Sequence, residues 1–411
     1  MTVRPADGVR ADPLGAVGRR RVVATLCATQ LTGWGVLFYG FPVLQGGIAA
    51  DTGWPATRVA GAFTAGQVVA AVAGLAVGRL LDHRGPRLLM TVGSGVGALA
   101  CLLVASANTP TTFLLAWLVA GAAMAMVLYA PAFAAITRWY DGRSRLRALT
   151  VLTVAGGLAS TVFAPLTAVL HNAVGWRAAY AVLAGAVALT VPAHWWGLRG
   201  AWAVGGERPS AAAAPRAVLT SGSFLALTAA LAVTGLCSTA VVVNLVPLLR
   251  EQGLGLSAAS AMLALGGLGQ VAGRIGYPSL ALRLGPVGQG VVVLGVLALT
   301  TALIGAVEAV SAVAVVVLVA GSARGCLTLL RATAVADRWG TGDYARLTAA
   351  LSLPVALASA AAPWVGTALA ARLGSHSEAF LVLAALNALA VGLVLATRVG
   401  PRSPQAVNPI R

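Results

Sequence analysis

The chain has 411 residues, of which 59% are hydrophobic and 9% are charged. A soluble domain carries about 25% charged residues, so this composition excludes a water-soluble protein and requires lipid as the solvent. The net charge of +17 comes from arginines that lie mostly at the ends of apolar runs, which favours membrane orientation over nucleic-acid binding.

The N-terminal segment, residues 1–21, is polar, contains proline and glycine, and ends in three consecutive arginines. It is typical of a disordered cytoplasmic tail. A signal peptide is the alternative, but the apolar run that follows, 22–48, is too long for the hydrophobic region of one. We therefore predict that 22–48 is the first membrane-spanning helix.

Eleven further runs have the length and composition of membrane-spanning helices. They are 58–80, 88–107, 111–136, 148–170, 177–198, 224–249, 258–280, 287–307, 310–334, 347–370 and 379–397. The one long polar break, 199–222, reads as a linker between two halves. The expected organisation is a cytoplasmic tail (1–21), a six-helix bundle (22–198), a cytoplasmic linker (199–222), a second six-helix bundle (223–397) and a cytoplasmic tail (398–411).

The arginines test this topology. With the N-terminus inside, 22 of the 28 arginines fall on the cytoplasmic side, four fall outside, and two lie within predicted helices. Positively charged residues concentrate in cytoplasmic loops. The bias predicts an all-α membrane protein with 12 spanning helices and with both termini in the cytoplasm.

The short connection between the second and third runs reads Gly-Arg-Leu-Leu-Asp-His-Arg-Gly-Pro-Arg over residues 78–87. Gly85 and Pro86 predict a chain reversal, and Asp82 can accept bonds from the free N–H groups of the next helix. The stretch resembles the Gly-x-Leu-x-Asp-x-x-Gly-x-Arg pattern of the major facilitator superfamily, matched by Gly78, Leu80, Asp82, Gly85 and Arg87. The alternative interpretation is any tight loop between two membrane helices.

The two halves repeat at a constant offset of 200 residues. Leu-Val-Ala-Gly at 118–121 recurs at 318–321, Arg-Trp at 138–139 recurs at 338–339, and Gly-Pro at 85–86 recurs at 285–286. An even number of helices in each half makes this a parallel repeat. It strengthens the resemblance, which implies two bundles around a central cavity that opens alternately to each side.

Arg274 is the strongest candidate for a substrate contact. It precedes Arg283 at the helix end by nine residues, or about 13 Å, so it lies near the membrane midplane. Gln270, Arg274 and Tyr277 share one helix face. Monocarboxylate and oxalate/formate transporters, which the chain also resembles, carry an arginine in this eighth helix that meets the substrate carboxylate. The alternative is an arginine bonded to helix carbonyls for structural reasons.

Other candidates lie in the first, fourth, seventh and tenth helices. Arg324 is also deep, and it shares a face with Thr328 and Arg331; a place in the inner vestibule is its alternative. Gly-Trp-Gly at 33–35 resembles part of the monocarboxylate pattern of helix 1. Possible polar or aromatic cavity groups are Gln30, Trp34, Tyr39, Tyr129 and Asn244, although helix packing is the favoured role for each of them taken singly.

No acidic residue is predicted at the midplane, because all eleven fall in tails, loops or helix ends. A cavity with positive charges alone attracts anions. The absence of a lysine in the eleventh helix departs from the oxalate/formate exchangers and argues against a dicarboxylate. We therefore expect a secondary transporter of a small organic anion such as a monocarboxylate, with efflux of a neutral or amphipathic compound as the alternative.

The remaining expectations concern partners. The sequence has no nucleotide-binding loop, no cluster of metal ligands and no nucleophile–base pair, so we expect no cofactor and no enzymatic activity. The four cysteines lie in apolar runs, so we expect them to be small core residues. We expect a monomer in the lipid bilayer of the cell membrane, with a small-molecule substrate and no nucleic acid partner.

Overall fold

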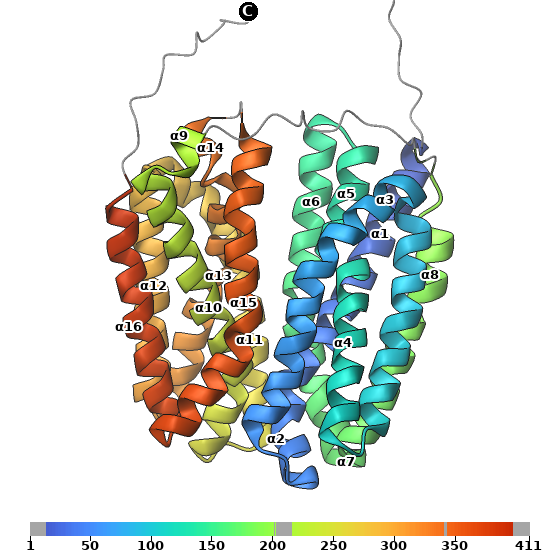
Figure 1. Ribbon diagram of the computed structural model, residues 1–411, viewed down its shortest axis with the longest axis vertical. Coiled ribbons are helices and arrows are strands. Elements are labelled where there is room, and N and C mark those ends of the chain that lie inside the picture. The colour runs from blue at the N-terminus through green and yellow to red at the C-terminus, as the bar shows by residue number, and fades with distance from the viewer. Residues whose placement is uncertain (1–13, 201, 203–215, 341–342, 398–411) are drawn as a thin grey trace, which may run out of the picture.

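The structure is a computed structural model that describes residues 14–200, 202, 216–340 and 343–397. Within these ranges it consists of helices and short connections, without β-strands. The predicted tails at 1–13 and 398–411 and the linker segment 203–215 lie outside the described residues. The N-terminal half (blue to green) and the C-terminal half (yellow-green to red) stand side by side (Figure 1).

The N-terminal half holds six spans, several of them interrupted. The first consists of α1 (Gly15–Trp34), a π-helical turn η1 (Gly35–Tyr39) and α2 (Gly40–Thr52). The second and third form α3 (Ala56–Ser106), and the fourth is α4 (Pro110–Val127) with α5 (Tyr129–Trp139). The fifth and sixth are built from α6 (Gly142–Gly157), α7 (Ala159–Ala188) and α8 (Thr190–Gly197).

The C-terminal half begins with the short α9 (Arg216–Leu219). Its spans are α10 (Gly222–Glu251), α11 (Leu256–Arg283), α12 (Pro286–Ala306), α13 (Val310–Thr333), α15 (Tyr344–Leu373) and α16 (His376–Leu395), with the single turn α14 (Ala336–Trp339) after α13.

Eleven helical stretches in the described residues are long and apolar enough to cross a membrane. One of them, Gly142–Gly197, has 56 residues and bends at Gly175 (φ 77°), so it holds two spans and brings the described total to twelve. The predicted all-α fold is confirmed. The first helix begins earlier than expected, at Gly15, because arginine is a good helix former, and Arg21 Nε anchors it by donating to Gly197 O at 3.2 Å.

The predicted reversal at residues 85–86 is confirmed. Gly85 adopts φ 73° and ψ 169°, the only non-helical residue within α3, and Pro86 starts the next span. The indole of Trp202 covers this turn and donates from Nε1 to the carbonyl oxygen of Asp82 at 3.1 Å. The Asp82 carboxylate was expected to accept from the following helix; instead it is exposed, and we find no such bond in the described part of the chain.

The internal repeat is also visible in helix packing. A Cβ atom at Gly121 of α4 would overlap the backbone of Gly66 in α3. At an offset of 200, a Cβ at Gly321 of α13 would overlap the backbone of Gly266 in α11. In each half, therefore, a glycine pair lets the second and fourth spans approach backbone to backbone.

Proline kinks supply two bonds that join the halves. Pro247 has no N–H, which leaves the carbonyl oxygen of Val243 without its helical donor. Gln45 of α2 fills that position and donates to Val243 O at 2.6 Å. In α15, the residue after Pro363 is Trp364, and its N–H donates to Thr64 Oγ1 of α3 at 3.0 Å.

These contacts lie at the end of the molecule that carries α2, opposite the end where α9 and α14 lie (Figure 1). Two further bonds between the halves, Asn172 Nδ2 to Ser257 Oγ (3.2 Å) and Thr161 Oγ1 to Ala264 O (3.0 Å), belong to the same interface. The two halves stand apart at the α9 end and meet at the α2 end, where α3 and α15 pack together (Figure 1). This conformation is therefore closed at the α2 end.

The predicted topology can be tested by cysteine labelling. Ser106, at the end of α3, and Ser144, in the first turn of α6, are both exposed and lie at opposite ends of the bundle. An impermeant maleimide applied to intact cells should label Ser106→Cys, whereas Ser144→Cys should label only after permeabilisation. The parent protein controls for its four buried or half-buried cysteines. External labelling of Ser144→Cys would reverse the orientation.

The reversal after α3 should influence the balance of conformations. Because α3 and α15 pack together at the closed end, closure of the other end would bring exposed Asp82 toward the N-terminus of α15, where a negative charge is favourable. Asp82→Asn should therefore slow transport by about 2- to 5-fold at unchanged expression. Initial transport rates in proteoliposomes provide the check, and a rate equal to the parent's would reduce this stretch to a plain turn.

Candidate functional site: a cavity between the halves

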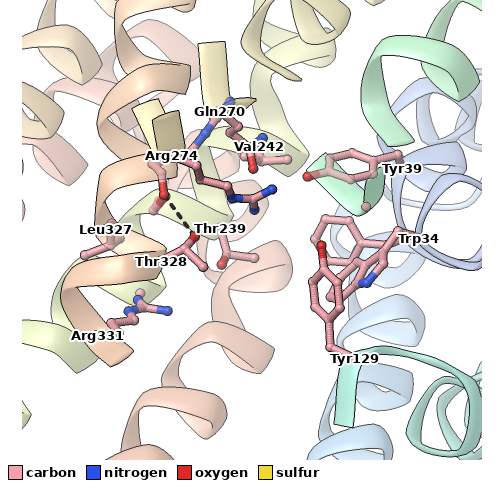
Figure 2. Close-up of a pocket in the computed structure, with 15 residues that line it drawn as sticks. Trp34, Tyr39, Tyr129, Thr239, Val242, Gln270, Arg274, Leu327, Thr328 and Arg331 are labelled. Atoms are coloured by element: carbon pink, nitrogen blue, oxygen red, sulfur yellow. Dashed lines mark hydrogen bonds between the residues drawn. The ribbon is translucent and has the colours of Figure 1, made fainter. Parts of the chain in front are cut away.

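A cavity of about 220 Å³ lies between the two halves. Its walls differ in chemistry: aromatic rings come from the N-terminal half, while arginine, amide and hydroxyl groups come from the C-terminal half (Figure 2). The lining residues are Trp34, Phe38, Tyr39, Tyr129, Gly156, Gly235, Ser238, Thr239, Val242, Gln270, Arg274, Arg324, Leu327, Thr328 and Arg331.

The π-helical turn η1 builds the upper part of the aromatic wall. A π-helical turn contains more residues than an α-helical one and often marks a functional site. Gly35 opens the turn, and the ring of Phe163 occupies the space where a Cβ would be. The distortion places Trp34, Phe38 and Tyr39 on the cavity side, with Trp34 and Phe38 edge to face at 5.6 Å between ring centroids.

Tyr129 reaches the cavity because the fourth span is broken. Pro131 lacks an N–H, so the carbonyl oxygen of Val127 loses its helical donor and the chain kinks at Leu128. Gln30, which is fully buried, donates from Nε2 to Val127 O at 2.6 Å and so stabilises the break. Gln30 therefore positions Tyr129 instead of lining the cavity itself.

The opposite wall carries the positive charge. Arg324 is only 8% exposed, and its Nε and Nη2 atoms are buried without a hydrogen-bond partner in the described residues. Arginine stays protonated in proteins. A buried arginine in a membrane span costs at least ~3 kcal/mol unless it meets water, a partner or a ligand. The Arg324 guanidinium therefore provides an unsatisfied cationic site.

Arg331 lies two turns further along α13, about 10 Å from Arg324 by helical rise. Its Nη2 makes a long bond of 3.4 Å to Leu231 O, and its Nε is buried without a partner in the described part of the chain. Arg331 lines the cavity, below Arg274 in Figure 2.

Arg274 crosses the interface between the halves. Its Nη1 donates to the carbonyl oxygen of Thr153 in α6, and a Cβ at Gly157 would overlap the same nitrogen. Its Nε is buried without a partner among the described residues. The carbonyl bond is the contact that the structural alternative for Arg274 expected. The side chain nevertheless lines the cavity and keeps one unused donor.

The cavity has no acidic lining residue in the described part of the chain, so its three arginines are not neutralised there. The ion pairs in the described residues, such as Arg177 to Asp51 at 2.5 Å, do not involve these three arginines. In a poorly hydrated site these fixed charges attract an anion and disfavour a cation.

The structure brings six of the candidate residues into one cavity, namely Arg274, Gln270, Arg324, Trp34, Tyr39 and Tyr129. It does not bring Tyr277 or Asn244 there. The Tyr277 hydroxyl donates to Gln289 Oε1 at 2.7 Å within the C-terminal half. Asn244 donates to Ala240 O and accepts from Thr367 Oγ1, each at 2.9 Å. Both side chains therefore satisfy their polar groups inside one bundle.

Sequence reasoning did not single out the α10 residues Ser238 and Thr239, which add hydroxyl groups to the C-terminal wall. Two adjacent hydroxyl residues in an otherwise apolar helix could have indicated this polar position. Thr328 and Arg331 were noted only as sharing a face with Arg324, and all three now line the cavity. No sequence pattern predicts that Phe38 lines the cavity, because its position depends on the π-helical turn.

The different surroundings of the two deep arginines predict opposite effects on stability. Arg324→Gln removes an unpaired buried charge and should stabilise the protein by on the order of 1–3 kcal/mol. Arg274→Gln loses a charged hydrogen bond to Thr153 O and should destabilise it by a similar amount. Thermal unfolding in detergent, with ligand absent, gives the comparison. Loss of stability in Arg324→Gln would mark its guanidinium as structural.

Comparison with known proteins agrees with this architecture. Residues 23–320, which are more than half of the chain, match the Major Facilitator Superfamily profile. No match was found among curated proteins. Among solved structures, the bacterial Spinster homologue in an inward-facing, occupied conformation has a TM-score of 0.71 at 12% identity, covering 94% of this chain and 97% of the other.

Two other solved structures have the same fold. The human organic anion transporter MFSD10 has a TM-score of 0.64 at 19% identity, covering 92% of this chain and 99% of the other. The nucleoside transporter NupG has a TM-score of 0.73 at 12% identity, with the same coverage of 92% and 99%. These identities show the fold alone. From its profile match and its twelve described spans, this chain belongs to the Major Facilitator Superfamily of membrane transporters.

Proposed function

We propose that this protein is a secondary transporter of a small organic anion such as a monocarboxylate. The observation that supports this most is the unpartnered, 8% exposed guanidinium of Arg324 in a cavity lined by two further arginines and, in the described residues, by no acid. A carboxylate in the cavity would pair with the Arg324 guanidinium through charge-assisted hydrogen bonds. It would also offset the cost of the buried charge.

The size of the cavity supports a small substrate. Pockets that hold drug-sized ligands span about 300–1,000 Å³, whereas this cavity has about 220 Å³. A short organic acid fits such a volume better than a bulky amphipathic compound. Efflux of a neutral or amphipathic molecule, the alternative from the sequence, would also leave the Arg324 charge without a partner.

Arg274 would couple the anion to the movement of the halves. In this conformation it bonds the Thr153 carbonyl across the interface. A carboxylate bound near Gln270 and Arg324 would compete for the Arg274 guanidinium, because an ionised acceptor is stronger than a neutral carbonyl. Occupancy would weaken that bond between the halves and shift the population of states, as alternating access requires.

The remaining proposals concern orientation and location. The bias of 22 arginines to four supports cytoplasmic termini. With that orientation, the closed end that carries Gln45 and Val243 faces outside. A cell membrane is the compartment most consistent with a multi-pass transporter of this kind.

Flux measurements test the proposal. Proteoliposomes containing the parent protein should take up labelled short monocarboxylates, and unlabelled carboxylates should compete. Arg324→Gln should weaken the apparent affinity on the order of 30- to 1000-fold, because a buried charge-assisted contact contributes about 2–4 kcal/mol. Arg324→Lys should recover only part of the affinity, because its ammonium lacks the planar fork of the guanidinium.

The control is Tyr277→Phe, which removes a hydroxyl group that bonds inside the C-terminal half and does not line the cavity. It should retain the parent's affinity. Uptake of neutral analogues equal to that of the acids, with no effect of Arg324→Gln, would contradict an anion transporter and favour the neutral-substrate alternative.

A further inference from the structure

Resting on the proposed function, we infer that the transported anion is a carboxylate attached to a planar, aromatic body, with its ring held by the N-terminal half and its carboxylate by the C-terminal half. The inference comes from the separation of aromatic and cationic groups onto opposite walls of one cavity (Figure 2). A short aliphatic acid would use only the cationic wall.

The aromatic wall is a connected set of rings. Trp34 and Tyr129 come from different spans, and their ring centroids lie 5.1 Å apart. Trp34 also contacts Phe38, and Phe38 contacts Tyr39 edge to face at 5.1 Å. Ring centroids 4.5–7 Å apart are typical of favourable aromatic pairs. The set forms a surface onto which one further ring can pack.

The faces of this surface are available to a ligand. Trp34 and Tyr129 are half-buried and line the cavity. By contrast, the five residues of η1 that follow Trp34 are buried. Tyr129 is already stacked on Phe133 on one side, with centroids 4.9 Å apart and ring planes 14° apart. Figure 2 shows both Trp34 and Tyr129 on the cavity side opposite Arg274 and Thr328. A planar ligand would extend this stack toward the C-terminal wall.

The aromatic wall also has polar groups to orient a substituted ring. Trp34 Nε1 is buried and has no hydrogen-bond acceptor among the described residues. Tyr39 extends toward Gln270 and Val242 across the cavity in Figure 2. A buried indole N–H without an acceptor is unfavourable, so a small shift of the Trp34 ring toward a hydroxyl or keto oxygen on the ligand would be favourable.

Together the two walls determine how an aromatic carboxylate would bind. The carboxylate bonds to Arg324 and competes for Arg274, the amide of Gln270 lies on the same wall, and the ring packs on Trp34 and Tyr129. Because each half holds a different part of one molecule, such a substrate would link the halves, whereas a short aliphatic acid would contact mainly one of them.

The test uses four compounds of graded chemistry: benzoate, 4-hydroxybenzoate, cyclohexanecarboxylate and benzyl alcohol. Binding to the purified full-length protein is measured by isothermal titration calorimetry. Benzoate should bind about 2- to 10-fold tighter than cyclohexanecarboxylate, as expected for an added aromatic contact. 4-Hydroxybenzoate should bind at least as tightly as benzoate, and benzyl alcohol, which lacks the carboxylate, should bind far more weakly than either.

Two variants separate this inference from the proposed function. Trp34→Leu should abolish the preference for benzoate over cyclohexanecarboxylate while it retains binding of both acids. Trp54→Leu, at a ring outside the cavity that packs on Phe113, is the matched control and should keep the preference. Thermal unfolding of each variant confirms that it is folded.

The outcomes are distinct. Equal affinity for the aromatic and the saturated acid in the parent protein would overturn the inference and leave the anion transporter intact. Failure of every carboxylate to bind, with binding of benzyl alcohol, would overturn the proposed function and the inference together. A preference for benzoate that persists in a folded Trp34→Leu variant would show that the ring does not rest on this wall.

Discussion

The site depends on positive charge that is buried where two bundles meet. Arg324 is nearly enclosed, stays protonated and leaves donors unused in the described residues. Lipid cannot solvate such a group, and no described acid lines the cavity to neutralise it. The cost of at least ~3 kcal/mol is understandable if an anion visits the site. The same charge makes the cavity selective, since a cation would meet three arginines.

The fold holds this site by interrupting helices and then satisfying the backbone groups that the interruptions release. Pro131 frees the carbonyl of Val127, and Gln30 bonds to it, which fixes the kink that presents Tyr129. Pro247 frees the carbonyl of Val243, and Gln45 bonds to it across the interface. Irregular backbone is tolerated in a membrane where neighbouring helices satisfy it. One such pair therefore builds the cavity wall and the other joins the halves beyond it.

Much of this arrangement could be predicted from the sequence, because hydrophobic length and the charge of loops depend on lipid alone. The twelve spans, the reversal at Gly85 and the depth of Arg274 follow from counting residues against helical rise. The offset of 200 between the halves located the repeat, which the structure shows again in the glycine pairs of α3–α4 and α11–α13. Each of these features depends on neighbouring residues or on a periodic pattern, and the sequence displays both directly.

The content of the cavity was less predictable, because it depends on side-chain direction and on contacts between distant segments. Tyr277 shares a helix face with Arg274, but Gln289 lies close enough to take its hydroxyl. Arg274 itself meets a carbonyl of α6, 121 residues away. The π-helical turn that brings Phe38 to the cavity has no periodic sequence pattern, since the turn depends on Phe163 packing against Gly35.

The most direct measurement is an experimental structure of the protein with a bound heavy-atom carboxylate. Crystals soaked with 4-bromobenzoate and recorded at the bromine absorption edge would locate the ligand by anomalous scattering. We predict one bromine peak beside Trp34 and Tyr129 on the aromatic wall, with the carboxylate on Arg324 and the bond from Arg274 to Thr153 broken or weakened. A carboxylate bound away from these arginines, or a cavity that stays empty while the ligand is transported, would contradict it.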